Sequence, residues 1–155
     1  MKTLNIASFN VRGLREEGKL TFLANDLDKY NVNICCLQET HIKEDIQQLI
    51  ITKSGEQFYY INCFTQNQFH GIGFIIQKGI EFKVLHLHDR LSKLCLDIPE
   101  EDPNNNFYSV KTRKLFIYNI YAPWRNSDPD TYMLYNILDN ELKTSSKNSF
   151  ICGDF

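Results

Sequence analysis

The chain has 155 residues, of which 43% are hydrophobic and 13% aromatic, and its formal net charge is −2. This length and composition suit one globular domain with its own core and exclude an intrinsically disordered protein. The charge balance excludes a protein that binds nucleic acid through a strongly basic surface alone. No apolar run approaches the ~20 residues that span a bilayer, and the five cysteines include no Cys-x-x-Cys pair. We therefore expect a soluble protein inside the cell, nuclear or cytoplasmic, with reduced cysteines, no membrane contact and no stable protein partner.

The first part of the chain predicts a strand, a helix and a second strand. Residues 3–11 alternate between two faces, as a strand does, and Gly13 follows as a turn. Residues 19–30 carry leucines at spacings of three and four, which predicts an amphipathic helix. The apolar run 34–37 is typical of a strand buried on both faces. A strand, helix and buried strand in this order indicate a right-handed parallel crossover, which sets the two strand ends side by side.

The rest of the chain predicts more strands and two more helices. The segment 44–53 is interpreted as a short helix, because Ile46, Leu49 and Ile50 form a stripe that Gly55 ends. A second helix is expected to begin at Asp128 and Pro129, an N-cap residue followed by a first-turn proline. The expected strands are 58–64, 72–77, 81–88, 92–98, 107–110, 115–121 and one that begins at 149, the middle ones forming antiparallel hairpins.

Four of the expected strands end in residues that can carry chemistry. Asn10, Glu39 and Asp154 supply an amide and two carboxylates, the hard oxygen ligands that suit Mg²⁺. Tyr121 ends the strand 115–121 and could donate a hydrogen bond to a phosphate oxygen. Each residue alone also fits a plain role, such as a turn asparagine or a solvated glutamate. Because open α/β sheets bind ligands at the carboxyl ends of their strands, we interpret the four ends as one metal-dependent phosphodiester site.

Four motifs that occur in order support this interpretation: Ser8–Leu14, Leu37–His41, Tyr118–Pro123 and Gly153–Phe155. Together they resemble the endonuclease/exonuclease/phosphatase family, and most of all the apurinic-type endonuclease domain of LINE-type, non-LTR retrotransposons. The segment Gly71–Phe74 is also similar to that family's Gly-x-Gly strand. The resemblance covers the whole chain but only the amino-terminal two-thirds of a usual family domain. We therefore expect residues 1–155 to form a single, truncated domain that is inactive alone.

The resemblance implies an α/β fold, a two-sheet (four-layer) sandwich with helices outside and the site at one rim. It implies that Asn10 and Glu39 hold a divalent metal, Mg²⁺ or alternatively Mn²⁺. It implies that Tyr121 contacts the scissile phosphate, and that Asp154 orients or deprotonates the attacking water. DNA is the implied partner, and a metal-dependent DNA endonuclease is the implied activity.

The chain also departs from the family pattern. The family's later Asp-His pair is absent, and His41, His86 and His88 are not obvious substitutes. Arg12 stands where many relatives carry an acidic or amide residue, so it could contact a phosphate or be solvated. Trp124 could stack on a nucleic-acid base or pack inside the protein.

Two other functions stay open from the sequence. One is a phosphatase of the same fold that acts on a phosphoinositide or another small phosphoester. The other is a non-catalytic, truncated remnant. A dinucleotide site at Gly71-x-Gly73 is rejected, because the third glycine and the following helix are both missing.

Overall fold

The computed structural model describes residues 3–100, 111–123, 129–145 and 148–155. Its first half contains β1 Ile6–Asn10, α1 Lys19–Lys29, β2 Ile34–Gln38, β3 Ile46–Ile51, β4 Gln57–Cys63 and β5 Ile72–Gln77. Its second half contains β6 Phe82–His88, β7 Leu91–Pro99, β8 Thr112–Tyr121, α2 Pro129–Thr144 and β9 Ser149–Asp154. The predicted strand 107–110 and the predicted N-cap Asp128 lie outside the described residues.

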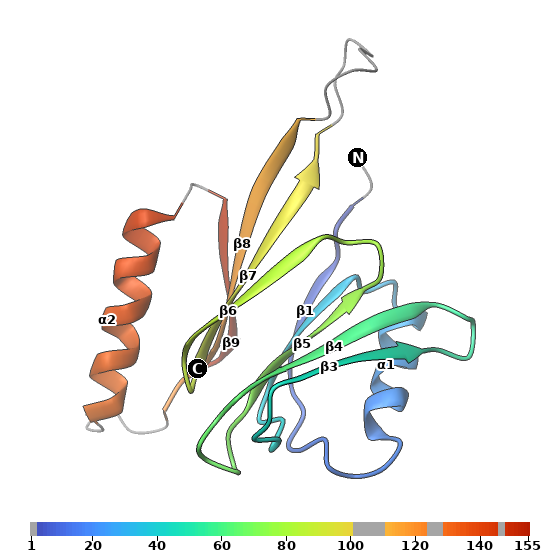
Figure 1. The fold of residues 1–155 in the computed structure, drawn as a ribbon, viewed down its shortest axis with the longest axis horizontal. Helices are drawn as coiled ribbons and strands as arrows, with labels where there is room; N and C mark the ends of the chain where they lie inside the picture. Colours follow the sequence, from blue (N-terminus) through green and yellow to red (C-terminus); the bar gives the residue numbers. More distant parts are fainter. Residues whose placement is uncertain (1–2, 101–110, 124–128, 146–147) are drawn as a thin grey trace.

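The strands form two mixed sheets (Figure 1). The first has the order β1-β2-β5-β4-β3, and the second has the order β6-β7-β8-β9. Strand β1 pairs in parallel with β2 through the α1 crossover, as predicted, and Asn10 lies opposite Gln38. Strand β8 pairs in parallel with β9, so that Tyr121 lies opposite Asp154. In each parallel pair, therefore, both strands end at the same edge of their sheet.

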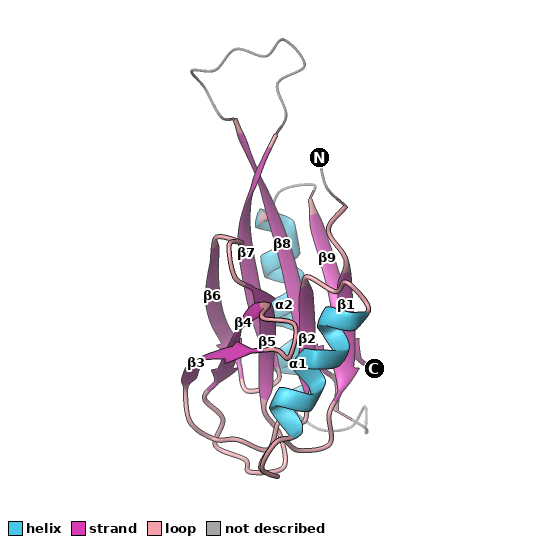
Figure 2. Cartoon of the chain, turned by 90° about the vertical axis from the view of Figure 1, so that its right-hand side faces the viewer, coloured by secondary structure: helices cyan, strands magenta, loops and turns pink. Residues whose placement is uncertain are grey.

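Three apolar layers join the two sheets and the two helices. Between the sheets lie side chains such as Phe74 from β5 and Ile117 from β8. Ala24 and Leu27 of α1 pack on the outer face of the first sheet. Leu134 and Leu138 of α2 pack on the outer face of the second sheet. Figures 1 and 2 show the resulting order of helix, sheet, sheet and helix, which confirms the predicted four-layer α/β sandwich.

The segment predicted as a helix over 44–53 is the strand β3, so that prediction is wrong. Ile46 and Ile50 both pack toward the α1 side of the first sheet, and a spacing of four residues puts two side chains on one face in either conformation. Leu49 and Ile51 are instead exposed. The β-branched isoleucines favour a strand, and β3 pairs with β4 along its whole length. Gly55, expected to end a helix, lies in the turn of this β3–β4 hairpin.

Helix α2 extends to Thr144. Within the described residues, no helix is long and apolar enough to cross a membrane.

Candidate active site

The site lies where β1, β2, β8 and β9 end, and the side chain of Asn10 connects the two sheets there. Asn10 Nδ2 donates a hydrogen bond to Glu39 Oε1 over 2.8 Å, just beyond the end of β2. The same nitrogen donates to Asp154 Oδ2 at the end of β9, also over 2.8 Å. The structure thus brings Asn10, Glu39 and Asp154 together, although it does not test the role predicted for each.

Tyr121 belongs to the same cluster. Its hydroxyl forms a hydrogen bond with the carboxylate of Glu39. Burial opposes ionisation of Glu39, but hydrogen bonds from Asn10 and Tyr121 outweigh it, so the pKa of Glu39 is lowered. Burial, together with the hydrogen bond to Glu39, raises the pKa of Tyr121 to about 12. At neutral pH the pair is therefore a carboxylate and a neutral phenol, which accept and donate a hydrogen bond respectively.

The backbone around the cluster is fixed by neighbouring loops. Gly13 N donates to Glu39 O over 2.6 Å, and Leu14 N donates to Thr40 O over 2.9 Å. On the other side, His41 N donates to His70 O over 2.8 Å. Glu39 itself has a φ of 53°, in the left-handed region that is unfavourable for residues other than glycine. Such conformations persist where the surrounding structure holds them and are common at functional sites.

A buried network of hydrogen bonds between the two sheets supports the site. Asn119 of β8 is fully buried, with 0% exposure, between the two sheets. Its Nδ2 donates to Leu37 O over 3.0 Å and to Gly73 O over 2.9 Å, and its Oδ1 accepts from Gln38 Nε2 over 2.7 Å. These bonds fix β8 of one sheet to β2 and β5 of the other, which keeps the strand ends in register.

The Gly71-x-Gly73 motif has a packing role. A Cβ atom on Gly73 would lie 2.7 Å from Ile61 O on the neighbouring strand. At Gly71, whose φ is +111°, a Cβ atom would overlap the hydroxyl of Thr40. Gly73 therefore allows close approach of β4, and Gly71 allows close approach of Thr40, the residue after Glu39.

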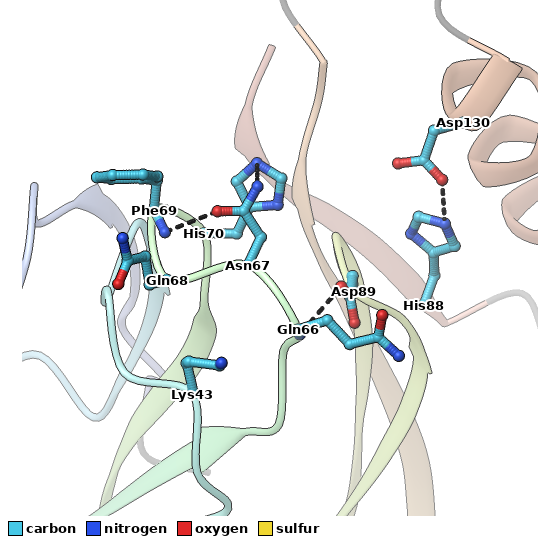
Figure 3. A pocket seen from close by; sticks show the side chains of 9 residues that line it. All are labelled: Lys43, Gln66, Asn67, Gln68, Phe69, His70, His88, Asp89 and Asp130. Atoms are coloured by element: carbon cyan, nitrogen blue, oxygen red, sulfur yellow. Dashed lines mark hydrogen bonds and ion pairs between the residues drawn. The ribbon is translucent and has the colours of Figure 1, made fainter.

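A polar hollow of about 740 Å³ lies beside this cluster (Figure 3). Its wall on one side comes from Lys43 and the loop that precedes β5, and on the other from the β6–β7 turn and the start of α2. The lining residues are Lys43, Gln66, Asn67, Gln68, Phe69, His70, His88, Asp89 and Asp130. The ring of His70 makes an edge contact with the ring of Tyr121, with 5.7 Å between the centroids, so the hollow adjoins the candidate site.

The side-chain oxygens of Asn10, Glu39 and Asp154 are the candidate ligands for a metal ion. Within the described residues, no three or more His, Cys, Asp and Glu side chains form a group that could hold a metal ion. Two carboxylates and one amide do meet, however, and the amide NH₂ of Asn10 now bridges the two carboxylates. Its Oδ1 accepts from Arg12 N over 3.0 Å. Rotation of this amide would present three hard oxygens, a set that fits Mg²⁺ or Mn²⁺.

Two other residues, Arg12 and Trp124, were predicted to contact the substrate. The Arg12 side chain is exposed at the edge of the site, and its charge contributes to lowering the pKa of Glu39. Trp124 lies outside the described residues. Sequence reasoning set His41 aside, but its Nε2 lies 3.6 Å from Glu39 Oε2.

Sequence reasoning also assigned no role to His70, Arg90 or Asn119, all of which adjoin or support the site. Asn119 had a usable signal, since it is a polar residue inside an otherwise apolar strand. His70 and Arg90 lie in loops and carried none.

Comparison with known proteins agrees with this architecture. This chain is similar in structure to the TDP2 protein of D. rerio, whose crystal structure was solved in a complex with a single-strand DNA product. The two share 12% identity with a TM-score of 0.55, over 96% of this chain and 58% of that one. This likeness concerns the fold, and the present chain spans less than two-thirds of that protein's length. The model of the Endonuclease/Exonuclease/phosphatase family matches residues 3–155, and the chain therefore belongs to this family of hydrolases that act on phosphoester bonds.

Proposed function

We propose that this chain is a metal-dependent phosphodiesterase domain that cleaves DNA as an endonuclease. The observation that carries the proposal is the meeting of Asn10, Glu39 and Asp154 through one bridging amide, with Tyr121 hydrogen-bonded to the same carboxylate. The single-strand DNA product in the D. rerio neighbour supports nucleic acid as the substrate class.

In this proposal, Glu39 and Asn10 hold a divalent cation. When bound, the cation would supply Lewis-acid polarisation of a phosphoryl oxygen. The low pKa of Glu39 keeps its carboxylate ionised and ready to bind a cation near neutral pH. With a cation bound, the amide of Asn10 would supply its oxygen as a ligand in place of its hydrogen bonds to the two carboxylates.

The other two residues act on the reacting groups. The carboxylate of Asp154 orients the attacking water and accepts its proton. Tyr121 stays protonated, because its pKa is about 12, and its hydroxyl donates to a non-bridging oxygen of the phosphodiester. The fixed backbone around Glu39 holds these groups in place before substrate binds, which lowers the cost of reorganisation.

Within the family, we propose the apurinic-type endonuclease of LINE-type retrotransposons as the nearest group. The motifs Leu37–His41 and Tyr118–Pro123 support this placement. A reverse-transcriptase region in the same open reading frame would support it further, and a lipid-binding module there would contradict it.

Nicking of supercoiled plasmid DNA tests the activity. Because residues 1–155 are expected to be inactive alone, the assay uses a longer form that carries this chain within a whole family domain. We expect this form, the parent in the cleavage assays, to nick the plasmid in Mg²⁺ or Mn²⁺ and to stop when a chelator is added. Replacing one transition-state stabiliser costs about 10²–10³ in kcat, so Glu39→Gln should lose at least that factor. The matched control is Glu81→Gln, an exposed glutamate just before β6, which should keep full activity. Hydrolysis of a phosphoinositide with no cleavage of DNA would contradict the proposal and favour a phosphatase.

A further inference from the structure

Arg90, in the turn between β6 and β7, contacts Tyr121 in two ways. Its guanidinium carbon lies 5.0 Å from the centroid of the Tyr121 ring, a cation–π arrangement. Its Nη1 donates to Tyr121 O over 3.3 Å, while Tyr121 N donates to Arg90 O over 2.9 Å. Side chain and backbone of Tyr121 are therefore both held by one residue, and that residue is only 12% exposed.

The same guanidinium determines the proton position on His70. Arg90 Nη2 lies 3.1 Å from His70 Nε2, and Asn67 Nδ2 lies 3.3 Å from the same ring nitrogen. An arginine side chain has only donors and keeps its proton in proteins, so His70 Nε2 must accept. A histidine whose Nε2 accepts carries its ring proton on Nδ1 and is neutral. The donors of Arg90 thus assign the tautomer of His70.

The charges around His70 agree with a neutral ring. Burial, and then the positive charge of Arg90, lower the pKa of His70, against the opposing effects of Asp89, Asp130 and Glu39. Asp130, at the start of α2, lies 3.6 Å from Arg90 Nε and 2.8 Å from His88 Nε2, so its negative charge is already engaged. Figure 3 shows His88 and Asp130 facing each other across the hollow from His70.

We propose that Arg90 positions Tyr121 and fixes His70 as a neutral Nδ1–H donor, and that His70 contacts a phosphate oxygen of the substrate in the hollow beside Tyr121. His70 lines that hollow and touches the Tyr121 ring, so an oxygen that reaches Tyr121 is within the range of a neighbouring donor. A neutral donor is suited to this place, because it stabilises charge on phosphate while giving no proton to Asp154. The substrate contact rests on the proposed function, whereas the Arg90–His70 pairing does not.

The first experiment tests the pairing of Arg90 with His70 by measuring the tautomer of His70 in the free protein. The chain has four histidines, so long-range ¹H–¹⁵N spectra of histidine-labelled protein can resolve each ring, with His70→Asn identifying the signal of His70. We expect Nδ1 protonated and Nε2 unprotonated in the parent, and loss of this fixed tautomer in Arg90→Met. Arg90→Lys serves as a second variant that keeps the buried charge if Arg90→Met does not fold. A lysine ammonium also has only donors, so Arg90→Lys should keep Nδ1 protonated. A parent His70 protonated on Nε2, or a tautomer unchanged in a folded Arg90→Met, would overturn the proposal.

The second experiment measures the substrate contact through the DNA cleavage kinetics of the longer form used for plasmid nicking. His70→Asn should lower kcat by about 10²-fold, as expected for one transition-state donor. In the Arg90→Met background the same change should have a much smaller effect, because Arg90 acts partly through His70. His86→Asn and Arg113→Met are the matched controls, since His86 lies on β6 and Arg113 lies at the opposite end of β8 from Tyr121.

The two experiments separate the possible failures. Cleavage by the parent with full activity in His70→Asn would overturn the substrate contact and leave the proposed function intact. If the longer form that carries the whole family domain cleaves no DNA at all, the proposed function and with it the substrate contact are overturned. The tautomer spectra then still decide the pairing of Arg90 with His70.

Discussion

Replacing Asn119 by Ala should destabilise the whole sandwich, because this side chain hydrogen-bonds β8 of the second sheet to β2 and β5 of the first. The variant loses three hydrogen bonds, to Leu37 O, to Gly73 O and from Gln38 Nε2. At about 0.5–1.5 kcal/mol each, these contribute about 1.5–4.5 kcal/mol to the free energy of unfolding. That is a large share of the roughly 5–15 kcal/mol typical of a domain.

Urea unfolding followed by circular dichroism measures this change. The matched control is Asn136→Ala, an exposed asparagine in α2, whose effect should stay within about 0.5 kcal/mol. A change of the same small size for Asn119→Ala would refute the idea that this network holds the sheets together. The variant should also lose activity at temperatures where it is still folded, since Asn119 lies two residues before Tyr121 in β8.

Three further predictions concern charge, packing and topology. The pKa of Glu39 is lowered in the folded protein, so its ionised form stabilises the metal-free fold above the unfolded value of 4.5. That contribution is lost as the pH falls through the folded pKa, so in pH-dependent urea titrations the parent should lose stability more steeply below pH 4.5 than Glu39→Gln. Parallel curves for the two proteins would contradict this. Leu134→Ala should cost about 2–5 kcal/mol in the same unfolding assay, because Leu134 is fully buried between α2 and the second sheet, whereas the exposed Met133→Ala should cost little. Ile50→Asp should unfold the protein and Ile51→Asp should be tolerated, because neighbours in a strand face opposite sides; equal effects would argue against the strand β3.

Much of the fold could be predicted from local patterns. The crossover from β1 to β2 followed from an alternating segment, an amphipathic helix and an apolar run, each with a distinct period. The β3 strand was missed because Ile46 and Ile50 are four residues apart, a spacing that suits either a helix or a strand. Only its pairing with β4, a long-range contact, decides between them.

The residues that meet at the candidate site could also be predicted from local patterns. Asn10, Tyr121 and Asp154 are the last residues of their strands, and Glu39 directly follows β2. Strands that run in parallel end at the same edge. Arg90 could not be found in this way, because its contacts join the β6–β7 turn to a residue 31 positions further along the chain. The contact with Tyr121 depends on the pairing of β7 with β8, and the contact of Arg90 with His70 depends on how the two sheets stack. No local period records either of these.

Binding of Mn²⁺ is the most direct test of the central claim, that these strand ends form one metal site. Mn²⁺ broadens NMR signals of nearby nuclei, so a titration of ¹⁵N-labelled protein locates the ion without requiring catalysis. We expect the amide signals of Asn10, Glu39 and Asp154 to broaden first and together, and Glu39→Gln to weaken this effect strongly. Broadening that begins elsewhere, or that is unchanged in Glu39→Gln, would contradict the account.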